Sequence, residues 1–420
     1  MNVDNYADRL RREILIRVAK AVWGAAPEAE LDHIAVEMRP RTGVQVSRCC
    51  IYKDRALIKY RCQAALGFGM EEETDETKPV SAYYREAMER TAPVQEILTV
   101  LDEACTACVR SRYMATDACR GCIAHPCLLN CPRQAIEMRN GQAHIRAEKC
   151  VNCGLCMNAC PYHAIIRVPI PCEEACPVGA ISKSENGRVS IDFAKCMYCG
   201  KCAQSCPFAA IAERSQMLDV MRALKGPEPV VALLAPSAAG QFPGTWGQLR
   251  MAVAALGFAD VMEVAAGAEE TVALESVEFV ERMEKGEPFM TSSCCPAFVE
   301  TVRRHIPELL PRVSATPSPM VLSARRAKAR WPGARTVFLG PCLAKRWEAR
   351  DLAEVDFVLT FEELGALLAA AGMDVARCEE SFAEEAPGAA ARGFAASGGV
   401  SRAIQLALPA GMEWKPVPVD

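Results

Sequence analysis

The sequence lacks the features that would place it in a membrane or on a secretory route. It contains no stretch of eighteen uncharged apolar residues, so no membrane span is expected. Residues 1–12 are charged and carry no apolar core segment, so a secretory leader is not expected either. The net charge of −4 is small for 420 residues and argues against a general nucleic-acid or membrane-surface binder. We therefore expect a cytoplasmic protein with neither nucleic-acid nor membrane partners.

Cysteine is scarce in the first hundred residues and abundant in the next hundred. Residues 1–100 hold three cysteines, whereas residues 105–206 hold sixteen of the 23. A disulfide scaffold would be typical of a short secreted chain, which this is not. The clustering therefore favours metal ligation over disulfides.

One phrase, Cys-Pro-x-x-Ala-Ile, occurs four times, starting at Cys131, Cys160, Cys176 and Cys206. Two of its copies end a complete C-x2-C-x2-C-x3-C-P run. These runs are Cys150, Cys153, Cys156, Cys160 and Cys196, Cys199, Cys202, Cys206. This spacing is the ligand pattern of a bacterial-type [4Fe–4S] site, whose fourth cysteine usually ligates the neighbouring cluster. Such clusters store and transfer single electrons.

The remaining cysteines of this block allow two more sites. Crossed ligation predicts four [4Fe–4S] clusters, with ligand sets Cys119, Cys122, Cys127, Cys160; Cys131, Cys150, Cys153, Cys156; Cys176, Cys196, Cys199, Cys202; and Cys105, Cys108, Cys172, Cys206. A zinc knuckle or free thiols stay open as alternatives at Cys105 and Cys108. Histidine can also ligate iron, but the cysteine supply is complete, so His125 and His163 are expected to be surface or packing residues.

Composition divides the chain into three expected domains. Residues 1–100 are predicted to form a small N-terminal α+β domain of unknown role, with a helix over 4–23, strands over 44–52 and 56–62, and a helix over 81–90. Residues 101–213 are predicted to form ferredoxin-like α+β [4Fe–4S] modules. Residues 226–420 are predicted to form an α/β domain with parallel sheets, because short apolar runs alternate with helical stretches. The predicted strands cover 229–235, 260–265, 288–292, 335–340 and 356–360.

Three fragments of the last third carry further candidate chemistry. Thr-Ser-Ser-Cys-Cys-Pro at 291–296 and Gly-Pro-Cys-Leu-Ala-Lys at 340–345 each follow a predicted strand, and Ser-Gly-Gly-Val at 397–400 leads into a helix. Strand C-terminal ends are where α/β sheets place ligands. A second metal site beside a lysine is therefore expected, with buried structural cysteines as the alternative.

These fragments resemble those of the [FeFe]-hydrogenases, and the likeness covers about residues 101–408. In that family the corresponding motifs bind the H-cluster, a [4Fe–4S] cubane bridged to a di-iron centre. The resemblance implies that Cys295 and Cys342 are cubane ligands. It also implies that Cys294 delivers protons to the di-iron centre and that Lys345 hydrogen-bonds one of its cyanide ligands.

The resemblance assigns further residues around this site. Ala235, Pro236 and Ser237 look like the family's pocket wall. Glu275, Ser314 and Glu278 fall where the family has a proton relay, and the two glutamates, three residues apart, share one face of a helix.

The sequence also departs from the family's pattern. The family has a third motif near its C-terminus with two further cubane cysteines, whereas the remaining later cysteine here, Cys378, stands in a different context. The first motif has an extra serine, Met320 stands where glutamine is common, and Gly340 where methionine is common. Either the chain is a fragment, or it is a hydrogenase-like protein that does not hold a complete H-cluster.

Two functions follow. The first is an anaerobic oxidoreductase that interconverts protons and H2, exchanging electrons through its clusters with a ferredoxin or another low-potential carrier. The second is a non-catalytic iron–sulfur electron carrier, redox sensor or assembly protein. The motifs favour the first for the family, and the absent third motif favours the second for this polypeptide, so whether the chain alone is an enzyme stays open.

Overall fold

The structure is a computed structural model that describes residues 5–43, 48–71, 73–105, 108, 112–184, 188–381 and 386–409. The described residues form two compact units. The first contains those up to 101, residues 193–200 and those from 211 onward; the second contains residues 102–192 and 201–210. No helix in the described part of the chain is both long enough and apolar enough to cross a membrane.

A four-stranded parallel sheet forms the centre of the first unit. Its strands are β9 (Val230–Leu234), β10 (Asp260–Glu263), β11 (Arg335–Leu339) and β12 (Phe357–Leu359), in the order β10-β9-β11-β12. Both faces are covered, so successive residues of a strand enter different cores: Ala232 packs in one and Leu233 in the other. Burial on both faces explains why β9 and β12 read as continuous apolar runs, whereas the edge strand β10 alternates.

The helices of this unit agree with the predicted alternation. They are α10 (Met217–Leu224), α11 (Trp246–Ala254), α12 (Ala265–Glu284), α13 (Pro296–His305), α14 (Pro319–Arg330), α15 (Ala344–Ala349), α16 (Phe361–Ala370), α17 (Ala389–Arg392) and α18 (Gly399–Ala407). The parallel α/β sheet is confirmed. The strand predicted over 288–292 is not formed, because Thr291 makes one isolated parallel bridge to Val313 instead of joining the sheet.

Four helices dominate the described part of the first hundred residues, and the one strand described there is β1 (Leu98–Val100) at its end. The helices are α1 (Tyr6–Trp23), α2 (Pro27–Met38), α3 (Ile51–Ala65) and α4 (Val80–Glu89). The strand predicted over 56–62 is wrong, since this segment lies inside α3, and residues 44–47 of the other predicted strand lie outside the described residues. Leu57, Ile58 and Cys62 are buried on one face, a helical rather than an alternating pattern.

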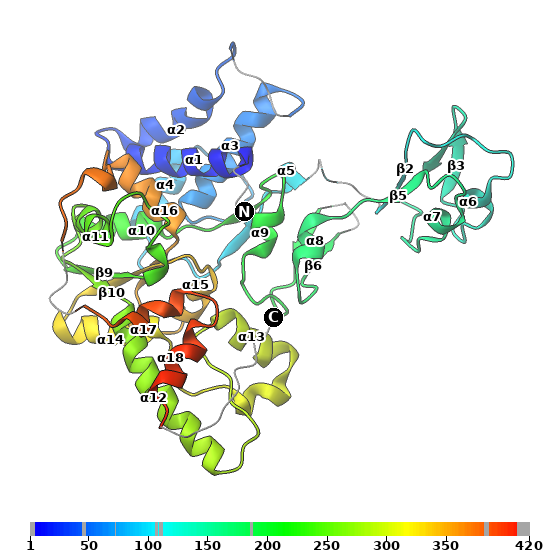
Figure 1. The fold of residues 1–420 in the computed structure, drawn as a ribbon. Coiled ribbons are helices and arrows are strands. Elements are labelled where there is room, and N and C mark those ends of the chain that lie inside the picture. The colour runs from blue at the N-terminus through cyan, green and yellow to red at the C-terminus, as the bar shows by residue number, and fades with distance from the viewer. Residues whose placement is uncertain are drawn as a thin grey trace. The chain divides into compact units, whose positions relative to one another are not determined.

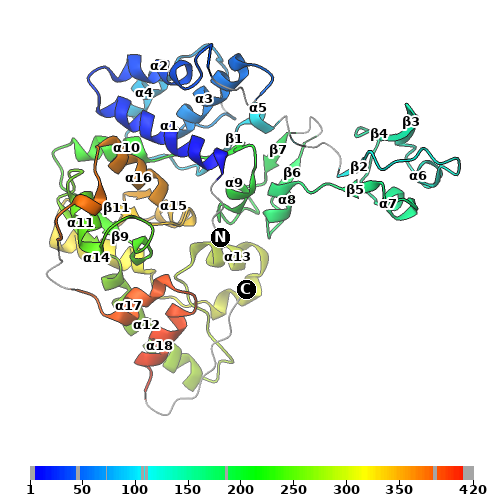
Figure 2. The ribbon, with the colours of Figure 1, turned by 45° about the horizontal axis from the view of Figure 1, so that its top comes forward.

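Residues 1–101 share a unit, and a hydrophobic core, with the parallel sheet. Helix α1 packs on α16 and α4 packs on α10, as the blue helices in Figures 1 and 2 show. Ile14 and Leu31 belong to the same core as Leu234 and Leu364. The chain therefore buries the apolar faces of its N-terminal helices against the α/β layer instead of against each other alone.

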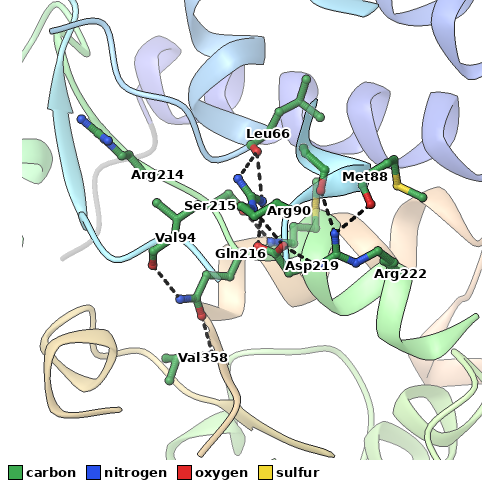
Figure 3. Close-up of polar contacts among 12 residues, drawn as sticks. Leu66, Met88, Arg90, Val94, Arg214, Ser215, Gln216, Asp219, Arg222 and Val358 are labelled. Carbon is green, nitrogen blue, oxygen red and sulfur yellow. Dashed lines mark hydrogen bonds and ion pairs between the residues drawn. The ribbon is translucent and has the colours of Figure 1, made fainter. Parts of the chain in front are cut away.

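A polar network joins α4 and the segment after it to α10 and β12 (Figure 3). Asp219 is buried and accepts from Arg90 at 2.8 and 3.1 Å. Arg222 reaches the same carboxylate at 3.3 Å. Gln216 accepts from the Val358 N–H at 2.8 Å and donates to the Val94 carbonyl at 3.3 Å. These bonds satisfy polar groups that would otherwise be buried without partners.

We expect Asp219→Ala to destabilise the first unit by roughly 3 kcal/mol. Burial raises the pKa of Asp219, although the guanidinium groups of Arg90 and Arg222 lower it. The loss of stability in the variant therefore comes mainly from leaving these two guanidinium groups without their carboxylate. Urea denaturation followed by tryptophan fluorescence measures the change. The exposed pair of Lys285 with Glu281 supplies the control, since Lys285→Ala should cost less than about 0.5 kcal/mol. Equal effects of the two substitutions would contradict this account.

The second unit is built from short hairpins and single helical turns. Antiparallel pairs join β2 (Tyr113–Ala115) to β5 (Ile165–Arg167), β3 (Ile136–Arg139) to β4 (Gln142–Ile145), and β6 (Ile181–Lys183) to β7 (Val189–Ile191). Its helices are α5 (Asp102–Cys105), α6 (Pro126–Leu129), α7 (Leu155–Ala159), α8 (Pro171–Ala175) and α9 (Lys201–Ser205). A further antiparallel pair, β1 (Leu98–Val100) with β8 (Ile211–Glu213), belongs to the first unit.

Candidate metal centres

Each Cys-Pro-x-x-Ala-Ile phrase folds into the same turn. In all four, the alanine N–H donates to the cysteine sulfur four residues earlier, over 3.2 Å at Cys131 and Cys176, 3.3 Å at Cys206 and 3.4 Å at Cys160. The residue before the alanine has a positive φ of 45–60° in each copy: Gln134, His163, Gly179 and Ala209. A backbone donor aimed at sulfur favours the thiolate, the form that binds metal.

Two hollows in the second unit are each surrounded by four cysteines. One is lined by Cys131, Cys150, Cys153 and Cys156, and the other by Cys119, Cys122, Cys127 and Cys160. In each set, three cysteines close together in sequence meet the cysteine that ends the other run. This is the crossed grouping predicted from the spacing. Four thiolates around one small, mainly apolar hollow fit a [4Fe–4S] cubane.

The third set that the structure brings together consists of Cys105, Cys108, Cys172 and Cys206. Burial, and next the charges of Cys206, Cys108 and Cys105, raise the pKa of Cys172 to about 11. Such repulsion requires the four thiols to be neighbours. The leftover cysteines of the sequence therefore converge within the second unit.

The remaining set is divided between the two units. Cys196 and Cys199 lie in the segment 193–200 of the first unit, whereas Cys176 and Cys202 belong to the second. Their grouping stays a prediction from the C-x2-C-x2-C spacing.

The cysteines of the second unit surround hollows instead of converging on one point. Within the described residues, no three His, Cys, Asp or Glu side chains converge closely enough to hold one metal ion. In a cubane each thiolate binds a different iron, so the ligands surround a volume instead of a point. At Cys105 and Cys108 a zinc knuckle stays open as the alternative to a cubane. His163 is exposed and supplies one of the left-handed turn residues, and neither it nor His125 lines the two cysteine hollows.

The second candidate site lies in the first unit, at the C-terminal ends of two strands. Ala235 follows β9 and Gly340 follows β11, and a Cβ built on Gly340 would lie 3.4 Å from that of Ala235. Pro236 and Ser237 form a short 3-10 helix directly after Ala235. Gly340 leads into Cys342 and α15. The parallel sheet thus brings the predicted pocket-wall residues, 235–237, and the fragment 340–345 to one edge.

Lys345 links the fragments to each other. Its buried Nζ donates to the carbonyl of Cys294 at 3.1 Å and to the Ser318 hydroxyl at 3.0 Å, and it pairs with Glu348 at 2.6 Å. A buried ammonium needs such partners. The bond to Cys294 is the contact that holds the Cys294-Cys295 segment against the Cys342 segment.

The three thiols of this site influence each other. Burial raises the pKa of Cys294, as does the charge of Glu275, while Lys345 lowers it. Burial also raises the pKa of Cys342; Lys345 opposes this and Cys295 adds to it. Cys295 is exposed. Cys294 and Cys342 therefore both lie near the Lys345 cation, and Cys295 lies near both of these thiols.

Glu275 on α12 is a buried carboxylate without hydrogen-bond partners. Glu275 is 0% exposed, and neither of its carboxylate oxygens accepts a hydrogen bond from the described residues. Burial, and next the charge of Glu278, raise the pKa of Glu275 to about 7, although the Ser293 amide and the Ser314 hydroxyl, which lie near the carboxylate but outside hydrogen-bond geometry, lower it. A carboxyl poised near neutrality beside a thiol is suited to proton transfer.

Glu278, one turn further along α12, is in the opposite state. Burial raises its pKa, but donors outweigh this and leave the pKa lowered: Ser314 at 2.6 Å, the Ala315 amide at 2.9 Å, Thr316 at 3.1 Å and Arg282 at 2.7 Å. Glu275, Ser314 and Glu278 are thus brought together, as expected. One carboxyl is set to hold a proton and the other to remain charged.

Sequence reasoning did not find several partners of this site. Ser318, which accepts from Lys345, is 27 residues away in sequence and carries no local signal. Arg282, which binds Glu278, stands four residues after it on α12, so the i,i+4 helical spacing could have indicated it. Thr316, which also binds Glu278, is two residues after Ser314. Cys378 is half-buried against the core of the first unit, with its sulfur 3.5 Å from the Asp374 carbonyl.

The fold and the cysteine groups define an iron–sulfur protein in which [4Fe–4S] modules precede an α/β domain with a second candidate metal site. Residues 228–416 match the family "Iron only hydrogenase large subunit, C-terminal domain". Residues 143–166 match a 4Fe-4S binding domain and residues 171–210 a 4Fe-4S dicluster domain. Residues 228–416 therefore form a domain of the [FeFe]-hydrogenase family, which confirms the resemblance, and the cofactors of the chain include [4Fe–4S] clusters.

Several known proteins are similar to parts of the chain. Iron hydrogenase 1 of Clostridium pasteurianum is 32% identical over 222 residues, covering 46% of this chain and 39% of that protein. The periplasmic [Fe] hydrogenase large subunit of Nitratidesulfovibrio vulgaris is 30% identical over 206 residues, covering 44% and 49%. The apo [FeFe]-hydrogenase HydA1 of Chlamydomonas reinhardtii shows 26% identity, 42% and 53% coverage, and a TM-score of 0.38. The chain spans less than half the length of the two curated relatives.

Proposed function

We propose that the protein passes electrons through four [4Fe–4S] clusters to or from a site at Cys294, Cys295 and Cys342, where protons and H2 interconvert. The observation that carries this is the buried, unpartnered Glu275 beside Cys294, with a pKa of about 7. An uncompensated carboxyl costs stability, so its presence beside a thiol is best explained by proton transfer.

In this proposal each residue of the second site has a defined task. Cys295 and Cys342 would hold a cubane of the H-cluster, which when complete supplies the redox chemistry of H2. Cys294 would exchange a proton with the reacting centre, and Glu275, Ser314 and Glu278 would carry it away from the site. Lys345 would fix the Cys294 segment and supply a positive charge. Ala235, Pro236 and Ser237 would line the pocket.

The electron partner that suits these clusters is a ferredoxin or another low-potential carrier. The cluster modules support this, because a chain of thiolate-bound cubanes transfers single electrons. The Electron transport protein HydN of Escherichia coli is 43% identical over 47 residues of this chain.

The ligand count favours a second candidate function. Besides Cys294, the described residues of the α/β domain place no further cysteine with Cys295 and Cys342, because Cys378 packs elsewhere. If no other ligands join Cys295 and Cys342, the second cubane is incomplete. The protein would then act as an iron–sulfur electron carrier, redox sensor or assembly protein. Infrared bands from iron-bound carbon monoxide and cyanide after expression with the maturation machinery would decide for the catalytic function, and their absence for this one.

Anaerobic reconstitution of the full chain should give close to sixteen irons in the accessory clusters, four for each cubane. Cys172→Ala should lower the total by about four irons, because Cys172 lies with Cys105, Cys108 and Cys206. Iron and acid-labile sulfide analysis measures this. Cys62→Ala is the control, since Cys62 is a fully buried thiol of the hydrophobic core and no loss of iron is expected. An unchanged iron content in Cys172→Ala would remove this residue from the ligand set.

A further inference from the structure

The segment 193–200, which carries Cys196 and Cys199, is stacked onto the α/β domain by aromatic rings. Tyr198 lies on Trp347 of α15 with ring centroids 4.1 Å apart and planes 13° from parallel. Phe193 extends the stack on the side of Tyr198 at 6.3 Å, and the Arg350 guanidinium covers Trp347 at 3.7 Å. Stacked rings of this kind add to the stabilisation from buried area alone.

Arg304 of α13 fastens the backbone of the same segment. Its guanidinium donates to the carbonyls of Phe193 at 2.6 Å and Cys196 at 2.8 Å, and it lies 5.4 Å from the Tyr198 ring and 5.0 Å from the Trp347 ring. The buried carboxylate of Glu300 holds its Nε at 2.8 Å. Arg304 therefore places a fixed positive charge beside a residue assigned as a cluster ligand.

The elements that hold this segment also carry the second site. Helix α13 begins directly after Cys295, and α15 begins two residues after Cys342. A Cβ built on Gly200, next to Cys199, would lie 3.4 Å from Leu343, next to Cys342. Thr301 and His305 of α13 make further bonds to the segment, to the Met197 sulfur and the Lys195 carbonyl, both at 2.8 Å. All of these residues lie within the first compact unit.

We infer that Trp347 and Arg304 are positioning residues for electron transfer between the cluster bound by Cys196 and Cys199 and the site at Cys295 and Cys342. This rests on the proposed function. Electron transfer slows steeply with distance, and the stack fixes one ligand loop against the two helices that follow the other ligands. The charge of Arg304 also stabilises the reduced cluster, so it raises the reduction potential of that cluster, which depends on nearby charge and hydrogen bonds.

The alternative is that the stack only stabilises the fold, and the reduction potential separates the two explanations. In the reconstituted full chain, Arg304→Gln should lower the midpoint potential of one cluster in an EPR-monitored titration while the iron content stays unchanged. Arg304→Lys, which keeps the charge, should lie nearer the wild-type potential. Arg303→Gln is the matched control: it is the neighbouring residue, shares Glu300 and is largely exposed, so no shift is expected.

The ring stack is tested separately. Trp347→Leu should alter the EPR line shape of the same cluster and slow its oxidation by the second site at least about tenfold in rapid-freeze experiments, whereas Trp347→Phe should restore both. Unchanged potentials and spectra in fully iron-loaded Arg304→Gln and Trp347→Leu would overturn the inference. A wild-type chain without iron at Cys295 would instead contradict the proposed function, and the potential shift at the Cys196 cluster would still be measurable.

Discussion

Replacing Glu275 with glutamine should make the protein more stable at neutral and alkaline pH, by on the order of 3 kcal/mol. The carboxyl has an ordinary pKa of 4.5 and a folded-state pKa of about 7, because burial disfavours its charge. Below about pH 4.5 both states bind the proton and the group has no effect on stability. As the pH rises from there through 7, the unfolded chain releases the proton first, so the wild-type protein loses stability that the glutamine variant keeps.

Urea denaturation between about pH 5.5 and 8.5 measures this difference, which should widen with rising pH. Glu278→Gln is the matched control with the opposite sign. The pKa of Glu278 is lowered, so its charged form stabilises the fold above its ordinary pKa, and the variant should be less stable at neutral pH. If Glu275→Gln destabilised the protein at pH 8, the carboxylate would have partners that satisfy it, and the argument for a proton relay would be lost.

The second large effect concerns the adjacent cysteines. In a preparation with a complete set of H-cluster ligands, Cys294→Ala should lower H2 turnover at least about a hundredfold and leave the iron content unchanged, because a positioned proton donor contributes this much. Cys295→Ala should instead lose about four irons, since it removes a cubane ligand. Methyl-viologen-linked H2 evolution and iron analysis measure the two effects.

Cys378→Ala provides the control for both, because Cys378 packs against the core of the first unit. It should change neither turnover nor iron content. Full activity in Cys294→Ala would exclude this thiol from the mechanism, and retention of all iron in Cys295→Ala would exclude that one from the ligand set.

The parallel sheet could be predicted because burial on both faces leaves a signal in each strand alone. Val230–Leu234 is apolar at every position and Arg335–Leu339 at its last three, and helical stretches follow both strands. The strand predicted over 56–62 was wrong because a short run of mixed apolar and polar residues is compatible with both the two-residue period of a strand and the 3.6-residue period of a helix. Its Leu57, Ile58 and Cys62 line one face of a helix that begins before this segment, at Ile51, and ends after it, at Ala65.

The candidate sites show the same division between local and distant information. Ligand spacing is local, so three of the four cysteine groups could be deduced from the sequence and are brought together by the fold. The Tyr198–Trp347 stack joins residues 149 positions apart by their numbers, and the bond from Lys345 to Ser318 crosses 27. No short pattern announces such pairs, because packing of separate elements creates them.

The interleaving of Cys119, Cys122, Cys127 and Cys160 with Cys131, Cys150, Cys153 and Cys156 has a consequence for biosynthesis. Each hollow needs a cysteine from the other run, so neither can be closed until residues 156–160 have left the ribosome. The two cages must then be completed almost together, on a chain already held by its hairpins. Oxidative loss of one cluster would free the segment that supplies a ligand to the other. Exposure to air should therefore destroy both clusters together instead of one at a time.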